Sequence, residues 1–367
     1  MGKKIFKITL WTIISLILLV VLILGGYLIY LSAQYYRIED NQVLEVSNAS
    51  ENLVSLNTNY TISTYNIGFG AYTHDFSFFM DSGEMLDGTK TQGTGSKAKD
   101  KETVLTNTNG AISVASELDA DFMFFQEVDV KATRSYKVNQ FEMLKESFSN
   151  YSNTCAYNFH SAFLFYPILD PHGATDAGIA TFSKYKIDSS IRRSFPIDEG
   201  FFAKFFDLDR CFSVNRLKIN GSDKELVLIN LHMSAYDKGG LIRAEQLSLL
   251  NSVLKEERDK GNYVVAGGDF NHDIADSIGK FETQEKKPEW TYSLSANQLT
   301  DGYSFATANN VPTCRSTDIA YTKGVNYTVV LDGFIVSDNV EVIEVENIDN
   351  DFMYSDHNPA KCVFKLI

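Results

Sequence analysis

The sequence predicts an α/β (α+β) four-layer sandwich: two packed, mostly antiparallel β-sheets flanked by helices and preceded by one transmembrane helix. Three observations lead to this prediction. Short apolar runs typical of strands outnumber helical stretches, polar residues recur where these runs end, and one long uncharged segment lies at the N-terminus. No repeat and no clean linker follows residue 59, which indicates one domain whose sheets bury their apolar faces against each other and against helices.

The uncharged segment covers residues 8 to 36 and exceeds the roughly 20 apolar residues that a helix needs to cross a bilayer. Lys3, Lys4 and Lys7 precede it, so the positive-inside rule places the N-terminus in the cytoplasm and the rest outside the cell. The alternatives are a buried core helix and a signal peptide cleaved near Gln34, although signal peptides have a shorter core of about 7 to 15 residues. We therefore expect a single-pass protein of the cell membrane with a cytoplasmic tip and anchor (1–36), a stalk (37–58) and one extracellular domain (59–367).

The net charge of the chain is −14, from 33 Lys and Arg residues and 47 Asp and Glu residues. Without the three lysines before the apolar segment, the net charge of the remainder is −17. A tight, nonspecific nucleic-acid binder normally presents a basic face. The acidic balance argues against such a binder, but it is compatible with a metal site, because carboxylates hold the metal and are partly neutralised by it.

The four cysteines, Cys155, Cys211, Cys314 and Cys362, are widely spread and form no C-x-x-C pair, which argues against a zinc site. An extracellular location permits disulfides, and four cysteines allow three pairings. Buried free thiols are the alternative that the sequence leaves open.

A long polar segment, residues 71 to 109, separates two apolar runs and is rich in Gly, Thr, Ser and Lys. Long connections are usually either mobile or functional. This one carries the single compact basic cluster outside the anchor: Lys90, Lys97, Lys99 and Lys101. Two interpretations stay open, a solvated flexible loop and a segment that steers a polyanion.

The apolar periodicity after this segment first indicates a helix and then a buried strand that ends at Glu127, because Ile112, Ala115 and Leu118 recur at helical spacing. A second helix is predicted over residues 241–261. Further strands are predicted over residues 178–187, 211–219, 225–233, 262–270, 330–338 and 360–367.

Polar residues of a few types follow these strands. They are Asn66, Glu127, His232, Asp269 with Asn271, Asp332, and the pair Asp356–His357 before the last strand. Each has an ordinary structural explanation, such as a turn cap, a surface acid or a satisfied core histidine. Their joint recurrence favours a binding site on one rim of a rigid scaffold, where such sites are commonly built.

The motifs "YNIGFG", "FQEVD", "LINLHMSAY", "GGDFN", "LDGFIVS" and "SDHNP" stand in the order and spacing of the endonuclease/exonuclease/phosphatase superfamily, which this chain resembles from about Thr61 to its C-terminus. The stretch "QEVDVKATRSYKVNQ" is further similar to a membrane-anchored bacterial branch of that deoxyribonuclease- and sphingomyelinase-like superfamily. The resemblance implies that residues 59–367 are the catalytic domain, and that Arg134 of this stretch binds substrate.

The resemblance implies a metal-dependent phosphoesterase. Mg²⁺ is the expected cation, with Mn²⁺ or Ca²⁺ as alternatives, since hard cations take oxygen ligands and one or two carboxylates suffice for Mg²⁺. Glu127 and Asp356 are the expected metal ligands, with Asn66 beside the metal and in contact with the substrate. The general base is either Asp269 or the His357–Asp332 pair, and the residues leave this choice open. Two further residues are expected to contact the phosphate or the attacking water, Asn271 and His232.

The expected reaction is hydrolysis of a phosphodiester outside the membrane, with nucleic acid as first choice and an endonuclease-like activity. The alternatives are a phospholipid or sphingomyelin head-group phosphodiesterase, an inositol-phosphate phosphatase and a catalytically silent binding domain. A bilayer-inserting aromatic hairpin would favour a lipid substrate, and "FFAKFF" at 201–206 is the candidate, with burial in the core as its alternative. The sequence indicates no protein partner.

Overall fold

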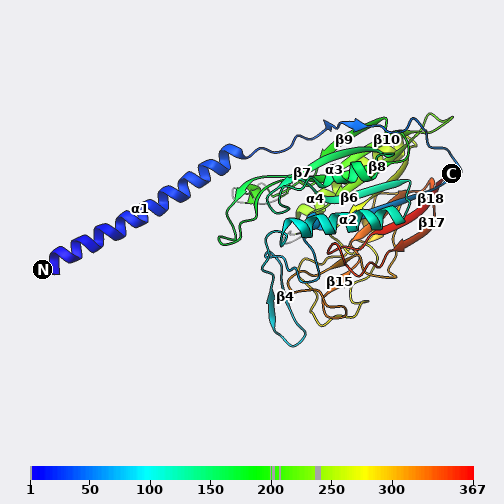
Figure 1. Cartoon of the computed structure of the whole chain (residues 1–367). Helices are drawn as coiled ribbons and strands as arrows, with labels where there is room; N and C mark the ends of the chain where they lie inside the picture. The colour runs from blue at the N-terminus through cyan, green and yellow to red at the C-terminus, as the bar shows by residue number, and fades with distance from the viewer. Residues whose placement is uncertain (1, 199, 201–202, 206–207, 236–240) are drawn as a thin grey trace.

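Two seven-stranded sheets pack face to face in the computed structural model, which describes residues 2–198, 200, 203–205, 208–235 and 241–367 (Figure 1). The first sheet contains, in spatial order, β1 (Gln42–Val43), β9 (Ser189–Ser194), β10 (Cys211–Lys218), β11 (Glu225–His232), β12 (Tyr263–Asp269), β16 (Asp332–Ser337) and β13 (Tyr303–Ala306). The second contains β17 (Val340–Asn347), β18 (Ala360–Leu366), β3 (Asn59–Asn66), β6 (Phe122–Ala132), β8 (Gly173–Ser183), β7 (Ser152–Leu164) and β2 (Val46–Ser47). Neighbours pair antiparallel except β11 with β12 and β3 with β6.

Helices cover the outer faces of both sheets, which confirms the predicted layered sandwich. The inner faces meet in a core that includes Ile62, Phe124, Leu228 and Phe334. Helix α4 (Leu241–Asp259) packs on the outer face of the first sheet through residues such as Leu250. Helices α2 (Lys101–Glu117) and α3 (Gln140–Ser147) pack on the second sheet.

The two predicted helices form for the expected reasons. Ile112 and Ala115 face the second sheet from α2, and Asp100 caps this helix by accepting a hydrogen bond of 2.7 Å from the backbone N–H of Thr103. Helix α2 begins within the long polar segment, so only its first part is a connection. The predicted helix over 241–261 appears as α4.

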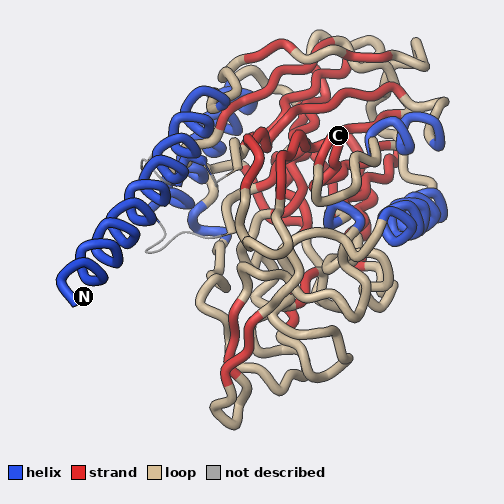
Figure 2. Tube along the Cα trace, turned by 60° about the vertical axis from the view of Figure 1, so that its left-hand side comes forward, coloured by secondary structure: helices blue, strands red, loops and turns tan. Residues whose placement is uncertain are grey.

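The polar segment at 71–99 is ordered by its own apolar residues. Tyr72, Phe76 and Ala98 are buried with Phe69 and Val104, next to α2. Its tip forms a hairpin of two short strands, β4 (Ser82–Glu84) and β5 (Lys90–Gln92). A second small sheet joins β14 (Cys314–Arg315) and β15 (Thr328–Val329), and the 3₁₀ turns are η1 (Gly68–Gly70), η2 (Ala203–Phe205) and η3 (Ala296–Gln298). Figure 2 shows the connecting loops gathered at one end of the sheets, with the β4–β5 hairpin projecting from them.

Residues 37–58, predicted to form a stalk, lie along the domain. β1 pairs with β9 of the first sheet and β2 with β7 of the second, and Val54 is fully buried in the core between the sheets. This arrangement differs from a free stalk, because the segment adds an edge strand to each sheet. All four cysteines are free.

The N-terminal helix α1 (Gly2–Gln34) projects from the domain (Figure 1), and it is long and apolar enough to cross a membrane. Its last turns are attached to the domain, because Leu31 is buried against Leu164 and Phe205. Phe205 belongs to the predicted "FFAKFF" segment and is buried as the alternative expected, whereas residues 201, 202 and 206 lie outside the described residues.

Candidate active site

Three side chains in a row across the first sheet form the base of the site. In the parallel pairing of β11 with β12, His232 lies beside Asp269, and in the antiparallel pairing of β12 with β16, Asp269 lies opposite Asp332. All three are buried, with exposed fractions of 1% each. The carboxyl end of β3 and the middle of β6 reach the same region from the second sheet, where Asn66 lies beside Gln126. The strand predicted to end at Glu127 in fact runs on to Ala132, because β6 continues its pairing with β8 beyond that residue. The strand-end pattern in the sequence is thus a consequence of register.

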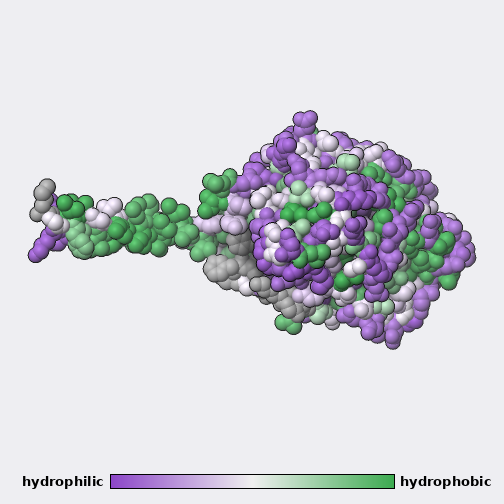
Figure 3. Space-filling view, turned by 90° about the horizontal axis from the view of Figure 1, so that it is seen from below, coloured by the Kyte–Doolittle hydropathy of each residue, from purple (hydrophilic) through white to green (hydrophobic). Residues whose placement is uncertain are grey.

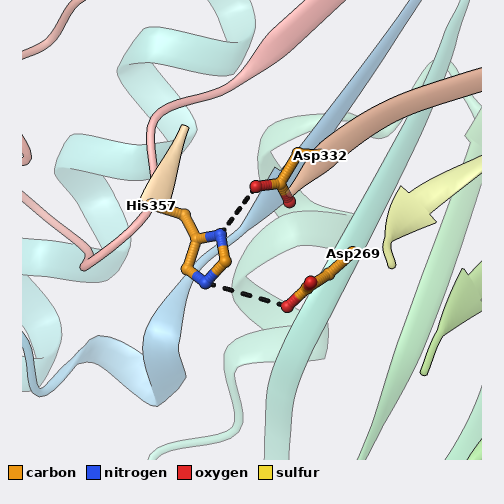
Figure 4. A group of neighbouring side chains, drawn as sticks. All are labelled: Asp269, Asp332 and His357. Atoms are coloured by element: carbon orange, nitrogen blue, oxygen red, sulfur yellow. Dashed lines mark hydrogen bonds and ion pairs between the residues drawn. The ribbon is translucent and has the colours of Figure 1, made fainter. Parts of the chain in front are cut away.

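His357 lies between the two acids of this row (Figure 4). Its Nδ1 is 2.8 Å from Asp332 Oδ2, and its Nε2 is 3.7 Å from Asp269 Oδ2. The turn that carries His357 is fixed by a β-bridge to Cys314 and by a hydrogen bond from the His357 backbone N–H to Ser355 Oγ. The turn therefore holds the imidazole where two strand-borne carboxylates converge.

The pKa values of this group follow from burial and mutual charge. Burial and the neighbouring charge of Asp332 raise the pKa of Asp269 to about 6, against the opposing effect of His357. Burial alone would lower the pKa of His357, but the carboxylates on either side, Asp332 foremost, raise it well above its usual value. Because it has an acid near each nitrogen, the imidazole is stabilised as a cation that donates to Asp332 through Nδ1 and lies in ion-pair contact with Asp269 through Nε2.

Glu127 reaches the site because the strand bulges there. The β6–β8 register shifts between Phe125 and Val128, and Glu127 has a φ of 55°, a conformation that a non-glycine residue adopts mainly under local constraint. Asn66 connects this carboxylate to the row below, since its Nδ2 donates to Glu127 Oε1 at 3.4 Å and to Asp269 Oδ2 at 3.0 Å.

Asp356 is the second carboxylate at the opening of the site. Burial and the negative charge of Glu127 raise its pKa to about 7. Gly68 leaves room for it: a Cβ there would come within 2.9 Å of Asp356 Oδ1, and its φ of +52° also suits glycine. Two carboxylates that destabilise each other's charge are a natural place for a cation.

Asn271 and His232 complete the predicted set. The Asn271 backbone N–H donates to Asp269 Oδ1 at 2.8 Å, and its side-chain Nδ2 donates to the carbonyl of Met233 at 2.8 Å. His232 Nε2 is 3.3 Å from Asp269 Oδ2, whereas its Nδ1 has no hydrogen-bond partner among the described residues. Burial, followed by the positive charge of Arg210, lowers the pKa of His232 well below its usual value, so this imidazole is neutral.

Two arginines lie near the site, one predicted and one not. Arg134 is 5% exposed and forms a buried ion pair with Asp129 at 2.8 Å, with its guanidinium 4.0 Å from the ring centre of Phe69. A role for Arg134 in substrate binding stays a prediction. Arg210, which precedes β10, was not predicted; it is 6% exposed, and its Nε and Nη1 have no partner within the part of the chain that the structure describes. In the sequence, Arg210 is marked only by its position directly before a strand, whereas the pattern that predicted the site concerns polar residues that follow strands.

The family model for the Endonuclease/Exonuclease/phosphatase family matches residues 63–357. The chain belongs to this family. Solved structures with a similar fold include an endonuclease/exonuclease/phosphatase from Bacteroides vulgatus (16% identity, TM-score 0.52, 84% of this chain and 100% of that chain). Two others are the human Nocturnin catalytic domain with bound sulfate (14%, 0.52, 88% and 97%) and D. rerio TDP2 with a single-strand DNA product (15%, 0.51, 84% and 100%). No curated protein matches the chain.

The site fits the divalent metal that enzymes of this family typically use. Asp269, Asp332 and His357 place ligand atoms within 4.8 Å of one another, and Asp332 Oδ2 already pairs with His357 Nδ1, whereas Asp332 Oδ1 has no hydrogen-bond partner among the described residues. Glu127 and Asp356 are instead partly exposed and raise the electrostatic cost of each other's charge. A hard cation between oxygen ligands would remove that cost, and the assignment of Glu127 and Asp356 as metal ligands stays a prediction.

Proposed function

We propose that this chain is a metal-dependent phosphodiesterase. One observation carries the proposal: an imidazole fixed between two buried carboxylates lies next to a second, partly exposed carboxylate pair. The first group handles protons and phosphate, while the second holds a cation. A catalytically silent domain has no need to keep Asp269, Asp332 and His357 buried together, because burying charges without a function costs stability.

Each side chain has a distinct role in the proposed reaction. Glu127 and Asp356, with Asn66 beside them, would hold a divalent cation, Mg²⁺ in the first instance, which neutralises charge on the phosphate and on the leaving oxygen. Asp269, oriented by Asn66, accepts the proton of the attacking water.

The imidazoles act on the phosphate. His357, charged and oriented by Asp332, donates to a phosphate oxygen. His232, which is neutral, would donate to the phosphate only in the tautomer that carries its proton on the unpartnered Nδ1. Asn271 orients the water or the phosphate through its amide. Arg210 supplies a further donor, because a buried guanidinium with two nitrogens unpartnered among the described residues is matched to a phosphate anion.

The substrate class is open between two candidates. Nucleic acid was the first choice from the sequence, but of the four lysines expected to steer a polyanion, Lys90 pairs with Glu84 and Lys97 pairs with Asp170 at 2.7 Å. These pairs reduce the free positive charge of the segment. A phosphodiester head group of a membrane lipid is the second candidate, and it is favoured by an exposed apolar loop, residues 165–169, beside α1.

We also propose that α1 is retained as an anchor, with the domain outside the cell. The hydroxyl of Tyr27 donates to the carbonyl of Phe163 at 3.1 Å, and the hydroxyl of Tyr30 accepts from the Phe163 backbone N–H at 3.1 Å. Cleavage near Gln34 would remove both contacts and expose Leu164. The lysines before the apolar segment orient the helix.

The test is hydrolysis by the full chain in detergent or nanodiscs. Bis(p-nitrophenyl) phosphate measures the chemistry without any preference for a substrate class, with Mg²⁺, Mn²⁺, Ca²⁺ or EDTA. Plasmid DNA, RNA, sphingomyelin and inositol phosphates then identify the class. Asp269→Asn should abolish turnover in every assay, whereas Asp338→Asn, which changes an exposed acid paired with Arg258, should have no effect. Metal-independent turnover that survives Asp269→Asn would refute the proposal.

A further inference from the structure

The loop between β7 and β8 presents four large apolar side chains to solvent. The exposed fractions are 56% for Phe165, 64% for Tyr166, 83% for Ile168 and 98% for Leu169. Single exposed apolar residues are ordinary, but a contiguous group of this kind marks a contact surface. Pro167 completes the run, so the five residues carry no charge.

This loop is attached to the C-terminal part of α1. The Phe165 backbone N–H donates to the hydroxyl of Tyr27 at 3.2 Å, and the two rings meet edge to face with centres 5.3 Å apart. Leu164 and Leu31 are buried together just behind this contact. Figure 3 shows apolar side chains along α1 and again where the helix meets the domain.

The length of α1 places this contact at the surface of the bilayer. The hydrocarbon core is about 30 Å thick, and a helix rises about 1.5 Å per residue, so about 20 residues cross it. Counted from Ile8, the first residue after the last N-terminal lysine, the core ends near Tyr27. Tyr27 is the residue that Phe165 contacts. Tyr27 and Tyr30 also have the amphipathic rings that favour the membrane–water interface.

We propose that residues 165–169 form a second membrane contact, inserting Ile168 and Leu169 into the outer surface of the bilayer that α1 crosses. The proposal rests on α1 being a membrane span, as proposed above, but not on any catalytic activity. A partner protein is the less suitable occupant, because the patch continues directly from the anchor and therefore already lies against lipid.

The polar segment at 71–99 packs against this loop and holds it in position. Lys97 Nζ is 2.7 Å from Asp170 Oδ1, and the hydroxyl of Ser96 donates to Asp170 as well. The ring of Phe79 packs against Tyr166 with centres 5.8 Å apart. The next residue, Met80, lines a cleft of about 1210 Å³ that also includes Ser234, two residues after His232. A docked loop would therefore hold this cleft close to the lipid head groups.

Tryptophan fluorescence in the full chain tests the proposal. Leu169→Trp is compared with Ile343→Trp, a partly exposed position on β17, both in a Trp11→Phe background so that the anchor contributes no signal. Trp290 is common to both proteins and gives the same background. The proteins are reconstituted in nanodiscs of phosphatidylglycerol and phosphatidylcholine, with or without lipids brominated near the top of the acyl chains.

The emission of Leu169→Trp should shift to the blue and be largely quenched by the brominated lipids, whereas Ile343→Trp should stay at water-exposed wavelengths and unquenched. Ile168→Trp serves as an independent reporter in case one variant folds poorly. Equal, unquenched emission from loop and control would overturn the proposal. So would a loop tryptophan that is shielded from aqueous acrylamide but insensitive to brominated lipid, because that result indicates a protein partner or a second copy. Neither outcome depends on turnover, so failure here is distinguishable from failure of the proposed phosphodiesterase.

Discussion

The pairing of His357 with Asp332 makes a quantitative prediction. Nδ1 and Oδ2 are 2.8 Å apart, both residues are buried, and the other oxygen, Asp332 Oδ1, has no hydrogen-bond partner among the described residues. A hydrogen bond to a charged group contributes about 1.5–3 kcal/mol. If Asp332 acts by orienting and charging the imidazole, Asp332→Asn should lower kcat by about 10- to 150-fold, since each 1.4 kcal/mol is a factor of ten.

The double mutant decides whether the two residues act as one unit. His357→Ala should lower kcat by about 10²- to 10⁴-fold, the usual contribution of a group that handles protons in the transition state. Once the imidazole is gone, Asp332 has nothing to orient, so Asp332→Asn/His357→Ala should be no slower than His357→Ala alone. The assay is kcat and KM on bis(p-nitrophenyl) phosphate at saturating metal, with thermal unfolding as the control for folding. A double mutant whose loss equals the product of the two single losses would refute the pairing as a functional unit.

Four other predictions address the metal, the phosphate contact, stability and topology. Glu127→Gln should lower activity and recover in part at high Mg²⁺, because it removes charge from the cation site; full activity at low Mg²⁺ would contradict that role. Arg210→Ala should lower kcat/KM by about 10- to 150-fold, with partial recovery in Arg210→Lys, as expected for a charged hydrogen bond of about 1.5–3 kcal/mol. Glu257 is buried, and although burial opposes its ionisation, its hydrogen bonds, that from Arg216 foremost, hold its pKa at about 2. The ionised side chain should therefore add about 3 kcal/mol to the free energy of unfolding at neutral pH, and this contribution is lost as the pH falls below about 4.5. Chemical denaturation should accordingly show a smaller loss of stability in acid for Glu257→Gln than for the unchanged protein. Protease added to intact cells should digest the domain and spare α1, and a domain protected until lysis would reverse the topology.

The rim of polar residues was predictable because it depends on alternation and register, both of which leave a trace in the sequence. His232, Asp269 and Asp332 each stand at a boundary between a buried strand and a loop, and the pairing of β11, β12 and β16 aligns those boundaries. The two glycines before Asp269, Gly267 and Gly268, allow the neighbouring strands to approach closely enough for this pairing. A Cβ on Gly268 would lie 2.0 Å from the carbonyl oxygen of Leu231, so the neighbouring strand could not approach as closely.

The bulge at Glu127 was not predictable, because it is a property of two strands. The run before Glu127 predicts a regular strand, whereas the shift arises only where β6 meets β8. The shift matters for function, because a one-residue slip exchanges the two faces of a strand and thus decides which side chain enters the site. Recognising the motif located Glu127; its geometry required the partner strand.

The loop of residues 165–169 shows that composition alone does not predict which apolar segment is exposed. Both "FFAKFF" and residues 165–169 are aromatic and apolar, but only the first was named from the sequence as a candidate for bilayer insertion, with burial in the core as its alternative. Within the first segment, Phe205 is buried against Leu31 and Leu164, whereas Leu169 is almost fully exposed. Burial depends on what packs against a segment, and α1 comes from more than a hundred residues earlier in the chain.

Net charge also proved a weak guide to the local field at the site. The chain carries a net charge of −14, yet Arg134, Arg210 and Arg315 are nearly buried around the carboxylates that would hold a cation. The charge of Arg134 is matched by Asp129, whereas two guanidinium nitrogens of Arg210 have no partner in the described part of the chain. Removing a charged group from water without a partner is costly, so such a group is maintained where an anion repeatedly occupies the space before it. An acidic protein can therefore bind a phosphodiester when a cation and a guanidinium such as that of Arg210 oppose its net charge at the point of contact.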